Sequence, residues 1–97
     1  MARFVVLMDF TDQGIKSVQE SPKRAAAART AFKAKGVELE QVYWTLGSHD
    51  IVAIVSAADG LEAAAALLQL GGAGNVRTTT LRAFDEAEFA TVLSKLD

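Results

Sequence analysis

Two short segments of this 97-residue chain carry apolar side chains on both faces of an extended strand. Residues 4–8 read FVVLM and residues 51–55 read IVAIV. A strand with one face in water alternates apolar and polar residues, so unbroken apolar runs indicate strands that are covered on both sides. The fold must therefore place a layer of protein over each face of these strands.

Turn and capping patterns divide the chain into alternating strands and helices. Strands are predicted at residues 3–10, 37–46, 51–57 and 75–84, with the short GSHD turn joining the second and third. A short helix is expected after Thr11, and a second is expected over residues 22–35, with Ser21 as its cap and Pro22 in its first position. It ends at Gly36.

Two further helices begin with a capping box, in which an Asp is followed three residues later by a Glu. Asp59 with Glu62 starts one helix, and Asp85 with Glu88 starts the last one. In the helix after Asp59, spacing predicts that Leu61, Ala64 and Leu68 face the core.

The basic residues of the helix over 22–35 are expected to form a solvated face; they are Lys23, Arg24, Arg29, Lys33 and Lys35.

The element order β-α-β-β-α-β plus a final helix is that of a ferredoxin-like α+β sandwich. Right-handed crossovers place both long helices on one face of an antiparallel sheet, with the last strand at an edge beside the first. The other face has no cover within residues 1–97, which we interpret as a single domain. The simplest cover is the sheet of a second copy, since stable interfaces bury about 800 Å² per partner. We therefore expect a homodimer or a higher oligomer.

Composition excludes several classes of function. A net charge of −2 argues against a nucleic-acid partner, and the absence of cysteine excludes thiol and disulfide chemistry. With His49 as the single histidine, we expect neither a metal site nor a cofactor. The first ten residues lack the apolar core of a signal peptide, and no segment has the roughly 20 apolar residues that span a bilayer. We expect a cytoplasmic protein with no membrane partner.

Polar residues on the strand over 75–84 suggest a binding site. Arg77 and Thr79 are expected on the sheet face opposite the helices, near Asp9 at the end of the first strand. An arginine in such a place needs a carboxylate or a bound anion. The candidate ligand-binding residues are Asp9, Tyr43, His49, Asp50, Arg77 and Thr79. The alternative is a solvated edge strand, in which charge and threonine prevent unwanted pairing.

Three stretches together resemble the GYD domain family of small bacterial and archaeal proteins. They read FVVLMDFTDQGIKSVQESPKR, LGSHDIVAIVSAADG and GNVRTTTLRAF, and they span nearly the whole chain in order. The Gly-x-Tyr-Asp hairpin that names the family reads Gly47-Ser48-His49-Asp50 here, so a role that needs a phenol is not carried over. The resemblance implies a fold similar to the dimeric α/β barrels and implies no established reaction.

Three functions remain open from the sequence. The leading one is a homo-oligomer that binds a small anionic metabolite in a cavity between sheet and partner. The second is a cofactor-independent or haem-assisted enzyme of the dimeric α/β barrel type, with His49 as its one acid or base. The third is a structural or regulatory oligomer without a ligand. Ser48-His49-Asp50 is not expected to be a catalytic triad, because consecutive side chains in a tight turn diverge.

Overall fold

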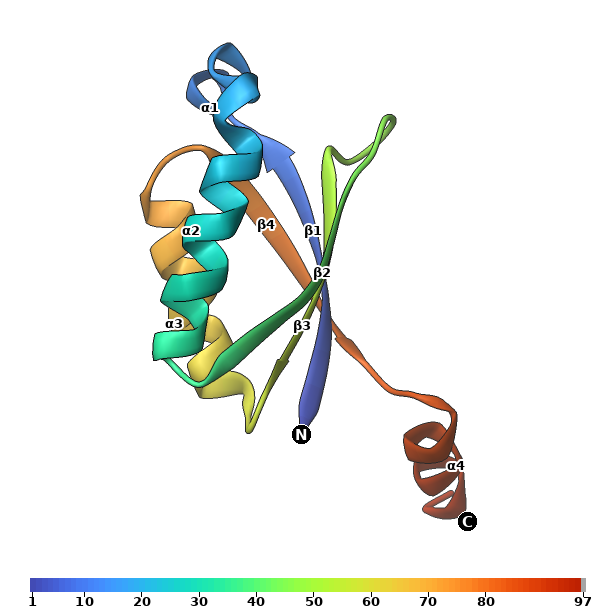
Figure 1. The fold of residues 1–97 in the computed structure, drawn as a ribbon. Coiled ribbons are helices and arrows are strands. Elements are labelled where there is room, and N and C mark those ends of the chain that lie inside the picture. Colours follow the sequence, from blue (N-terminus) through green and yellow to red (C-terminus); the bar gives the residue numbers. More distant parts are fainter. Residues whose placement is uncertain (97) are drawn as a thin grey trace.

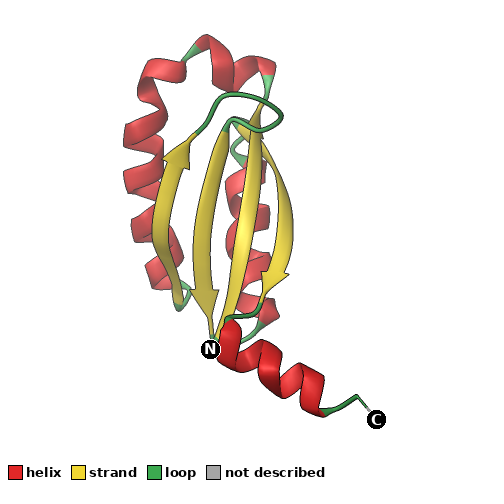
Figure 2. Ribbon diagram, turned by 90° about the vertical axis from the view of Figure 1, so that its right-hand side faces the viewer, coloured by secondary structure: helices red, strands yellow, loops and turns green. Residues whose placement is uncertain are grey.

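Four antiparallel strands form one sheet in the order β2-β3-β1-β4, in a computed structural model that describes residues 1–96 (Figures 1 and 2). The strands are β1 (Ala2–Phe10), β2 (Val37–Trp44), β3 (Ile51–Ala57) and β4 (Val76–Ala83). The helices are α1 (Asp12–Lys16), the 3-10 helix η1 (Val18–Glu20), α2 (Ser21–Ala34), α3 (Gly60–Gly72) and α4 (Glu86–Ser94). The predicted ferredoxin-like α+β fold is confirmed, with β4 at the edge beside β1.

Helices α2 and α3 lie together on one face of the sheet (Figure 1). Alternation along β1 sends Val6 and Met8 into this layer, where they are buried, with Phe4 and Phe10 packed against the same core. The other buried apolar residues of this core are Phe32, Val37, Leu39, Ile51, Ala53, Val55, Ala57, Ala63, Ala66, Leu67 and Val76. Burial of these side chains is the main force that holds the helices on the sheet.

Three of the predicted helix caps form as expected. The side chain of Thr11 accepts the N–H of Gly14, and both capping boxes, at Asp59 and Asp85, are complete. The prediction for Ser21 is wrong: the helix begins one residue earlier, so Ser21 is its first residue and caps nothing. Its hydroxyl instead accepts a hydrogen bond of 2.9 Å from the indole Nε1 of Trp44.

The prediction of the buried side of α3 is also wrong. Leu61 and Leu68 are 79% and 77% exposed, and Ala64 is exposed as well. The residues that meet the sheet are Ala63, Ala66 and Leu67. Because α3 is apolar almost all round, spacing alone allows either stripe to be buried, and the path of the chain from β3 to β4 selects one.

The sheet face opposite the helices, here called the open face, is not covered by any element of residues 1–96. Its centre is formed by Val5 and Leu7 of β1 with their partners Ile54 and Val52 of β3, all half-buried. Tyr43 on β2 and Leu81 on β4 extend it, with exposures of 55% and 49%. The prediction that the two central strands are apolar on both faces is therefore confirmed, and one of those faces is open in the single chain.

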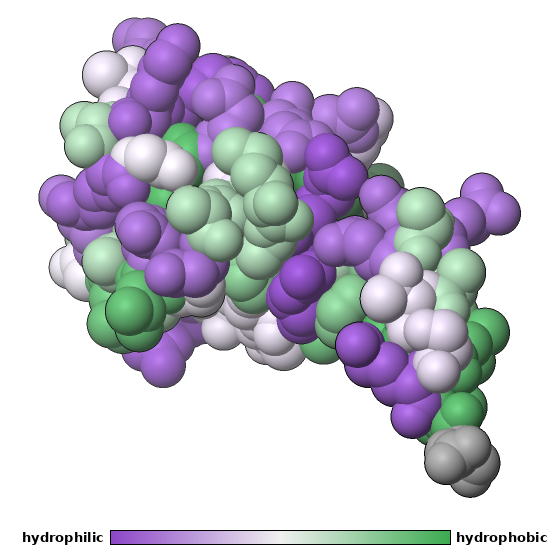
Figure 3. Space-filling model, turned by 90° about the horizontal axis from the view of Figure 1, so that it is seen from below, coloured by the Kyte–Doolittle hydropathy of each residue, from purple (hydrophilic) through white to green (hydrophobic). Residues whose placement is uncertain are grey.

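Helix α4 projects from the body of the molecule (Figures 1 and 2). None of its residues is buried, and its apolar side chains Phe89, Val92 and Leu93 are 51%, 37% and 49% exposed. Figure 3 shows hydrophobic side chains along this projecting helix. The projection contributes to the elongated shape of the chain, which measures 51 × 31 × 18 Å.

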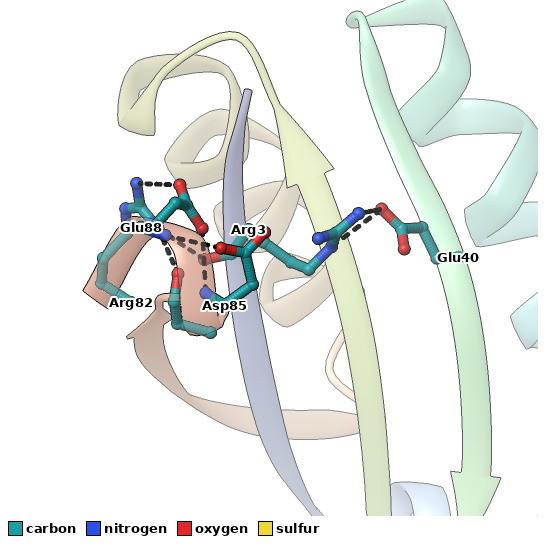
Figure 4. A network of polar contacts seen from close by, with 6 residues as sticks. Arg3, Glu40, Arg82, Asp85 and Glu88 are labelled. Atoms are coloured by element: carbon teal, nitrogen blue, oxygen red, sulfur yellow. Dashed lines mark hydrogen bonds and ion pairs between the residues drawn. The ribbon is translucent and has the colours of Figure 1, made fainter. Parts of the chain in front are cut away.

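One arginine holds the base of this helix. Arg82 of β4 reaches Glu88 of α4, with 3.7 Å between Nη2 and Oε2, and donates to the carbonyl oxygen of Arg3 (Figure 4). Its guanidinium also lies over the ring of Phe84, 4.5 Å from the centroid. These contacts link the first turn of α4 to the end of the sheet.

Candidate functional site

The candidate site lies at the end of the open face where β1 finishes. Asp9 pairs with Arg77 across β1 and β4, so both residues lie on the face opposite the helices. The loop between β2 and β3 brings His49 to the same place, with 3.2 Å between its Nδ1 and Oδ1 of Asp9. Asp9 and His49 thus lie together at one end of the open face, and Arg77 is the residue opposite Asp9 on the neighbouring strand.

Asp9 contacts His49 rather than the arginine that the sequence suggested. Arg77 is exposed, and within residues 1–96 no carboxylate forms an ion pair with it. Because Arg77 is exposed in the single chain, water solvates its charge and no protein counter-charge is required. Arg77 is instead a cation at the edge of the open face that is free to meet an anion.

Asp50 has a structural role in this corner. Its Oδ2 accepts the backbone N–H of Phe10 at 2.9 Å, and its own N–H donates to the carbonyl of Met8 at 2.9 Å. These bonds tie the β2–β3 loop to the last residues of β1. The carboxylate of Asp50 is therefore engaged with the backbone, which holds His49 beside Asp9.

Tyr43 and Thr79 lie further from this corner. The register forms one row across the open face, from Tyr43 through Val52 and Leu7 to Thr79. Neighbouring strands are about 4.8 Å apart, so the two ends of the row are roughly 14 Å apart. Thr79 therefore borders the cluster of Asp9, His49 and Arg77, and Tyr43 lies at the opposite edge, where its hydroxyl donates to Oε1 of Gln41.

The hairpin does not form a catalytic triad. His49 contacts Asp9, Asp50 contacts the backbone of Phe10, and Ser48 is exposed. Within residues 1–96 no three His, Asp or Glu side chains come together as metal ligands. In the same part of the chain, no helix is both long and apolar enough to cross a membrane.

Arg24 is a residue whose place the sequence does not reveal. The pattern predicts a solvated face, yet Arg24 is half-buried and its guanidinium donates to three acceptors in α1 and the following turn. No sequence pattern marks this residue among the other basic residues of α2. Only the return of α1 and η1 over the first turn of α2 distinguishes it.

Comparison with known proteins agrees with this architecture. The GYD domain family matches residues 4–93. The glutamine synthetase and cystathionine beta-lyase binding protein of Thermus thermophilus is 34% identical over 89 residues, which cover 91% of this chain and 94% of that protein.

Three solved structures share the fold. The feast or famine regulatory protein of M. tuberculosis, solved with L-methionine, superposes with a TM-score of 0.68 at 19% identity over 88% of this chain. MtbAldR superposes with a TM-score of 0.69 at 14% identity, also over 88% of this chain. This chain spans about half of each, 51% and 52% respectively. At these identities the likeness concerns the fold alone.

The third structure matches over nearly its whole length. TTHA0845 of Thermus thermophilus has a TM-score of 0.57 at 26% identity, with coverage of 88% of this chain and 95% of that one. The family match extends over nearly all of the chain described here, and the relative from Thermus thermophilus is similar along almost its full length. The chain belongs to the GYD domain family.

Proposed function

We propose that this protein is a self-associating binding module: two copies pair through their open faces, and the pair attaches to metabolic enzymes. The observation that carries the proposal is the uncovered apolar centre of the open face. Val5, Leu7, Val52 and Ile54 form it from the two central strands. A contiguous apolar patch with polar residues around it is typical of a site that binds another protein.

The border of the open face supports a specific contact rather than unspecific aggregation. Arg3 and Glu40 form an ion pair of 3.3 Å at one end (Figure 4), and Asp9 with His49 lies at the other. An apolar centre with a polar rim is the usual anatomy of a protein interface. If two copies pair about a two-fold axis, the same contact covers the apolar face of both copies.

The attachment to enzymes is supported by the relative that is named as a binding protein for glutamine synthetase and cystathionine beta-lyase. We assign this contact to α4, because the open face is used by the second copy. The exposed stripe of Phe89, Val92 and Leu93 is the apolar face of an amphipathic helix held away from the body. Such a helix binds by placing its stripe in a groove of a partner.

Analytical ultracentrifugation at micromolar concentration tests the pairing. The wild type is expected to sediment as a dimer or larger, and Ile54→Asp on the open face is expected to sediment near the monomer mass of 10.3 kDa. Leu68→Asp is the matched control, because it places the same charge on the exposed side of α3. A wild-type protein that sediments as a monomer overturns the pairing.

Calorimetry with purified glutamine synthetase and cystathionine beta-lyase tests the attachment. Leu93→Asp on α4 is expected to remove enzyme binding and leave the dimer unchanged. If Leu93→Asp instead dissociates the dimer, a second copy covers α4. Enzyme binding that is equal in wild type and Leu93→Asp contradicts the assignment to α4.

A second candidate function is the binding of a small anion at the cluster of Asp9, His49 and Arg77. It is supported by the exposed Arg77, which pairs across the strands with Asp9, the residue that contacts His49. Titration with small carboxylates and phosphates followed by calorimetry tests it. Arg77→Met is expected to remove binding, and Lys33→Met, on the opposite side of the sheet, is expected to retain it. Equal binding by wild type and Arg77→Met excludes this site.

A further inference from the structure

A cavity of about 280 Å³ opens between α2, α3 and the helix-covered face of the sheet. Alanine residues form most of the wall on α2, among them Ala25, Ala28 and Ala31, and the wall on α3 consists of Ala66, Gln69 and Leu70. Larger apolar side chains form its floor; they are Met8, Leu39, Val42, Ile51 and Val76. The cavity exists because methyl groups are too short to fill the space where two helices lie side by side over a sheet.

One end of the cavity is polar and carries a single cation. Ser21 and Arg24 from the start of α2, and Gln69 and Asn75 from the end of α3 and the residues after it, line the cavity. Arg24 is the only ionisable residue among those that line it in the described part of the chain.

The guanidinium of Arg24 is held in place without a counter-charge. Nη1 donates to the carbonyl and the hydroxyl of Ser17 at 3.1 and 3.0 Å, and Nη2 donates to the carbonyl of Gly14 at 3.2 Å. All three acceptors are neutral, and within residues 1–96 no carboxylate lies within ion-pair distance of Arg24. A guanidinium group has five N–H donors, so Nε and one N–H of Nη2 are not used by these bonds.

We propose that this cavity binds a small apolar monocarboxylate, with its carboxylate on Arg24 and its hydrocarbon body between α2 and α3. A fixed guanidinium without a counter-charge suits a carboxylate, and the positive end of the α2 dipole lies at the same end. The volume equals roughly nine water volumes of about 30 Å³, which suits an aliphatic acid the size of octanoate. This site is separate from the open face, because it lies on the other side of the sheet.

The only tryptophan of the chain provides a reporter for this site. The indole Nε1 of Trp44 donates to Oγ of Ser21, and Ser21 lines the cavity. A carboxylate that arrives at the polar end changes the surroundings of this hydrogen bond. Titration with octanoate is therefore expected to change the fluorescence of Trp44 in a saturable way.

Octanol and octylamine are the matched probes, because they keep the hydrocarbon chain and change the charge. Octanoate is expected to bind at least about tenfold more tightly than either, since hydrogen bonds between two charged groups are stronger than those to a neutral group. Equal affinities for octanoate and octanol would show that Arg24 does not bind the carboxylate, and would overturn the proposal. No saturable octanoate binding at millimolar concentration overturns the proposal.

Two variants with matched controls locate the binding. Arg24→Gln is expected to weaken octanoate binding about tenfold, whereas Lys23→Gln, an exposed cation on the same helix, leaves it unchanged. Ala28→Leu fills the cavity and is expected to abolish binding, whereas Ala26→Leu on the exposed side of α2 does not. Octanoate binding by Ala28→Leu at wild-type strength overturns the proposal.

Methyl NMR of the wild-type protein keeps the proposal testable if Ala28→Leu does not fold. Octanoate is expected to shift the methyl resonances of Ala25, Ala28 and Ala66. Shifts confined to Val5, Leu7 and Ile54 would mean that octanoate binds only the open face, and the cavity would be excluded as its site.

Discussion

The Nδ1 atom of His49 lies 3.2 Å from Oδ1 of Asp9, and this contact joins the loop between β2 and β3 to the end of β1. Both side chains are partly exposed, at 35% and 45%. Water therefore screens the pair, and its contribution to stability is that of a surface contact. Its consequence is positional, because it holds the imidazole of His49 at the end of β1, on the open face.

A double-mutant cycle on Asp9→Asn and His49→Gln is expected to give a coupling free energy of no more than about 1 kcal/mol in urea denaturation at pH 6. Each single variant should remain folded, because the backbone bonds of Asp50 still hold the loop. A coupling of several kcal/mol would mean that the pair is far less exposed in solution than in the single chain described here.

Asp50→Ala is expected to lower the free energy of unfolding by about 1–3 kcal/mol. The substitution leaves the N–H of Phe10 without the carboxylate that accepts it at 2.9 Å, in a part-buried position. Urea denaturation measures the loss. Asp50→Asn retains an acceptor oxygen and should recover part of it; equal losses in both variants would show that the charge, rather than the hydrogen bond, is needed.

Gly14→Ala is expected to destabilise the protein by about 1–3 kcal/mol. A Cβ atom there would clash with the carbonyl oxygen of Asn75, and the backbone must move to accommodate it. Gly60→Ala is the control, because a Cβ at Gly60 meets no heavy atom within 4 Å. Gly60→Ala should be neutral or stabilising by about 0.5 kcal/mol. Equal denaturation midpoints for Gly14→Ala and Gly60→Ala would contradict the close approach of α1 to Asn75.

Asp85→Ala is expected to loosen α4 without unfolding the core. Loss of an N-cap costs about 1 kcal/mol, which corresponds to about fivefold faster hydrogen exchange in the first turns of the helix. Asp59→Ala removes the equivalent cap from α3, which packs on the sheet, and should instead lower the midpoint of global unfolding. Hydrogen exchange and urea denaturation distinguish the effects of the two variants. A fall in the midpoint of global unfolding for Asp85→Ala would mean that α4 is packed on another surface in solution.

The cap of α3 should also respond to acid. Hydrogen bonding with the side chain of Glu62, and then with the N–H of Leu61, lowers the pKa of Asp59 below its ordinary value of 3.8. A lowered pKa in the folded state means that the ionised cap stabilises the protein above about pH 3.8, and that this contribution is lost as the pH falls through the lowered pKa. Asp59→Asn should remove this part of the pH dependence between pH 2 and 5 in urea denaturation, and Asp12→Asn should not.

The short-range features of this protein could be predicted from the sequence. The bounds of β3, the capping boxes at Asp59 and Asp85 and the order of the elements depend on neighbours within a few residues. The alternation along β1 and β4 was also sufficient to place Asp9 and Arg77 on the face away from the helices. These properties depend on local geometry and on the alternation of side chains between the two faces of a strand. Both can be read from the order of the residues.

The partners of the polar side chains were decided by the tertiary structure. Asp9 meets His49 instead of Arg77, and Arg24 is enclosed by α1, because contacts between segments far apart in the chain depend on how loops return. The buried side of α3 was decided in the same way, since its apolar residues surround the helix and only the crossover from β3 to β4 chooses among them. The cavity between α2 and α3 is likewise a property of the two helices together. Each alanine of α2 is an ordinary helix residue on its own, and space remains because these short side chains face α3 over the sheet.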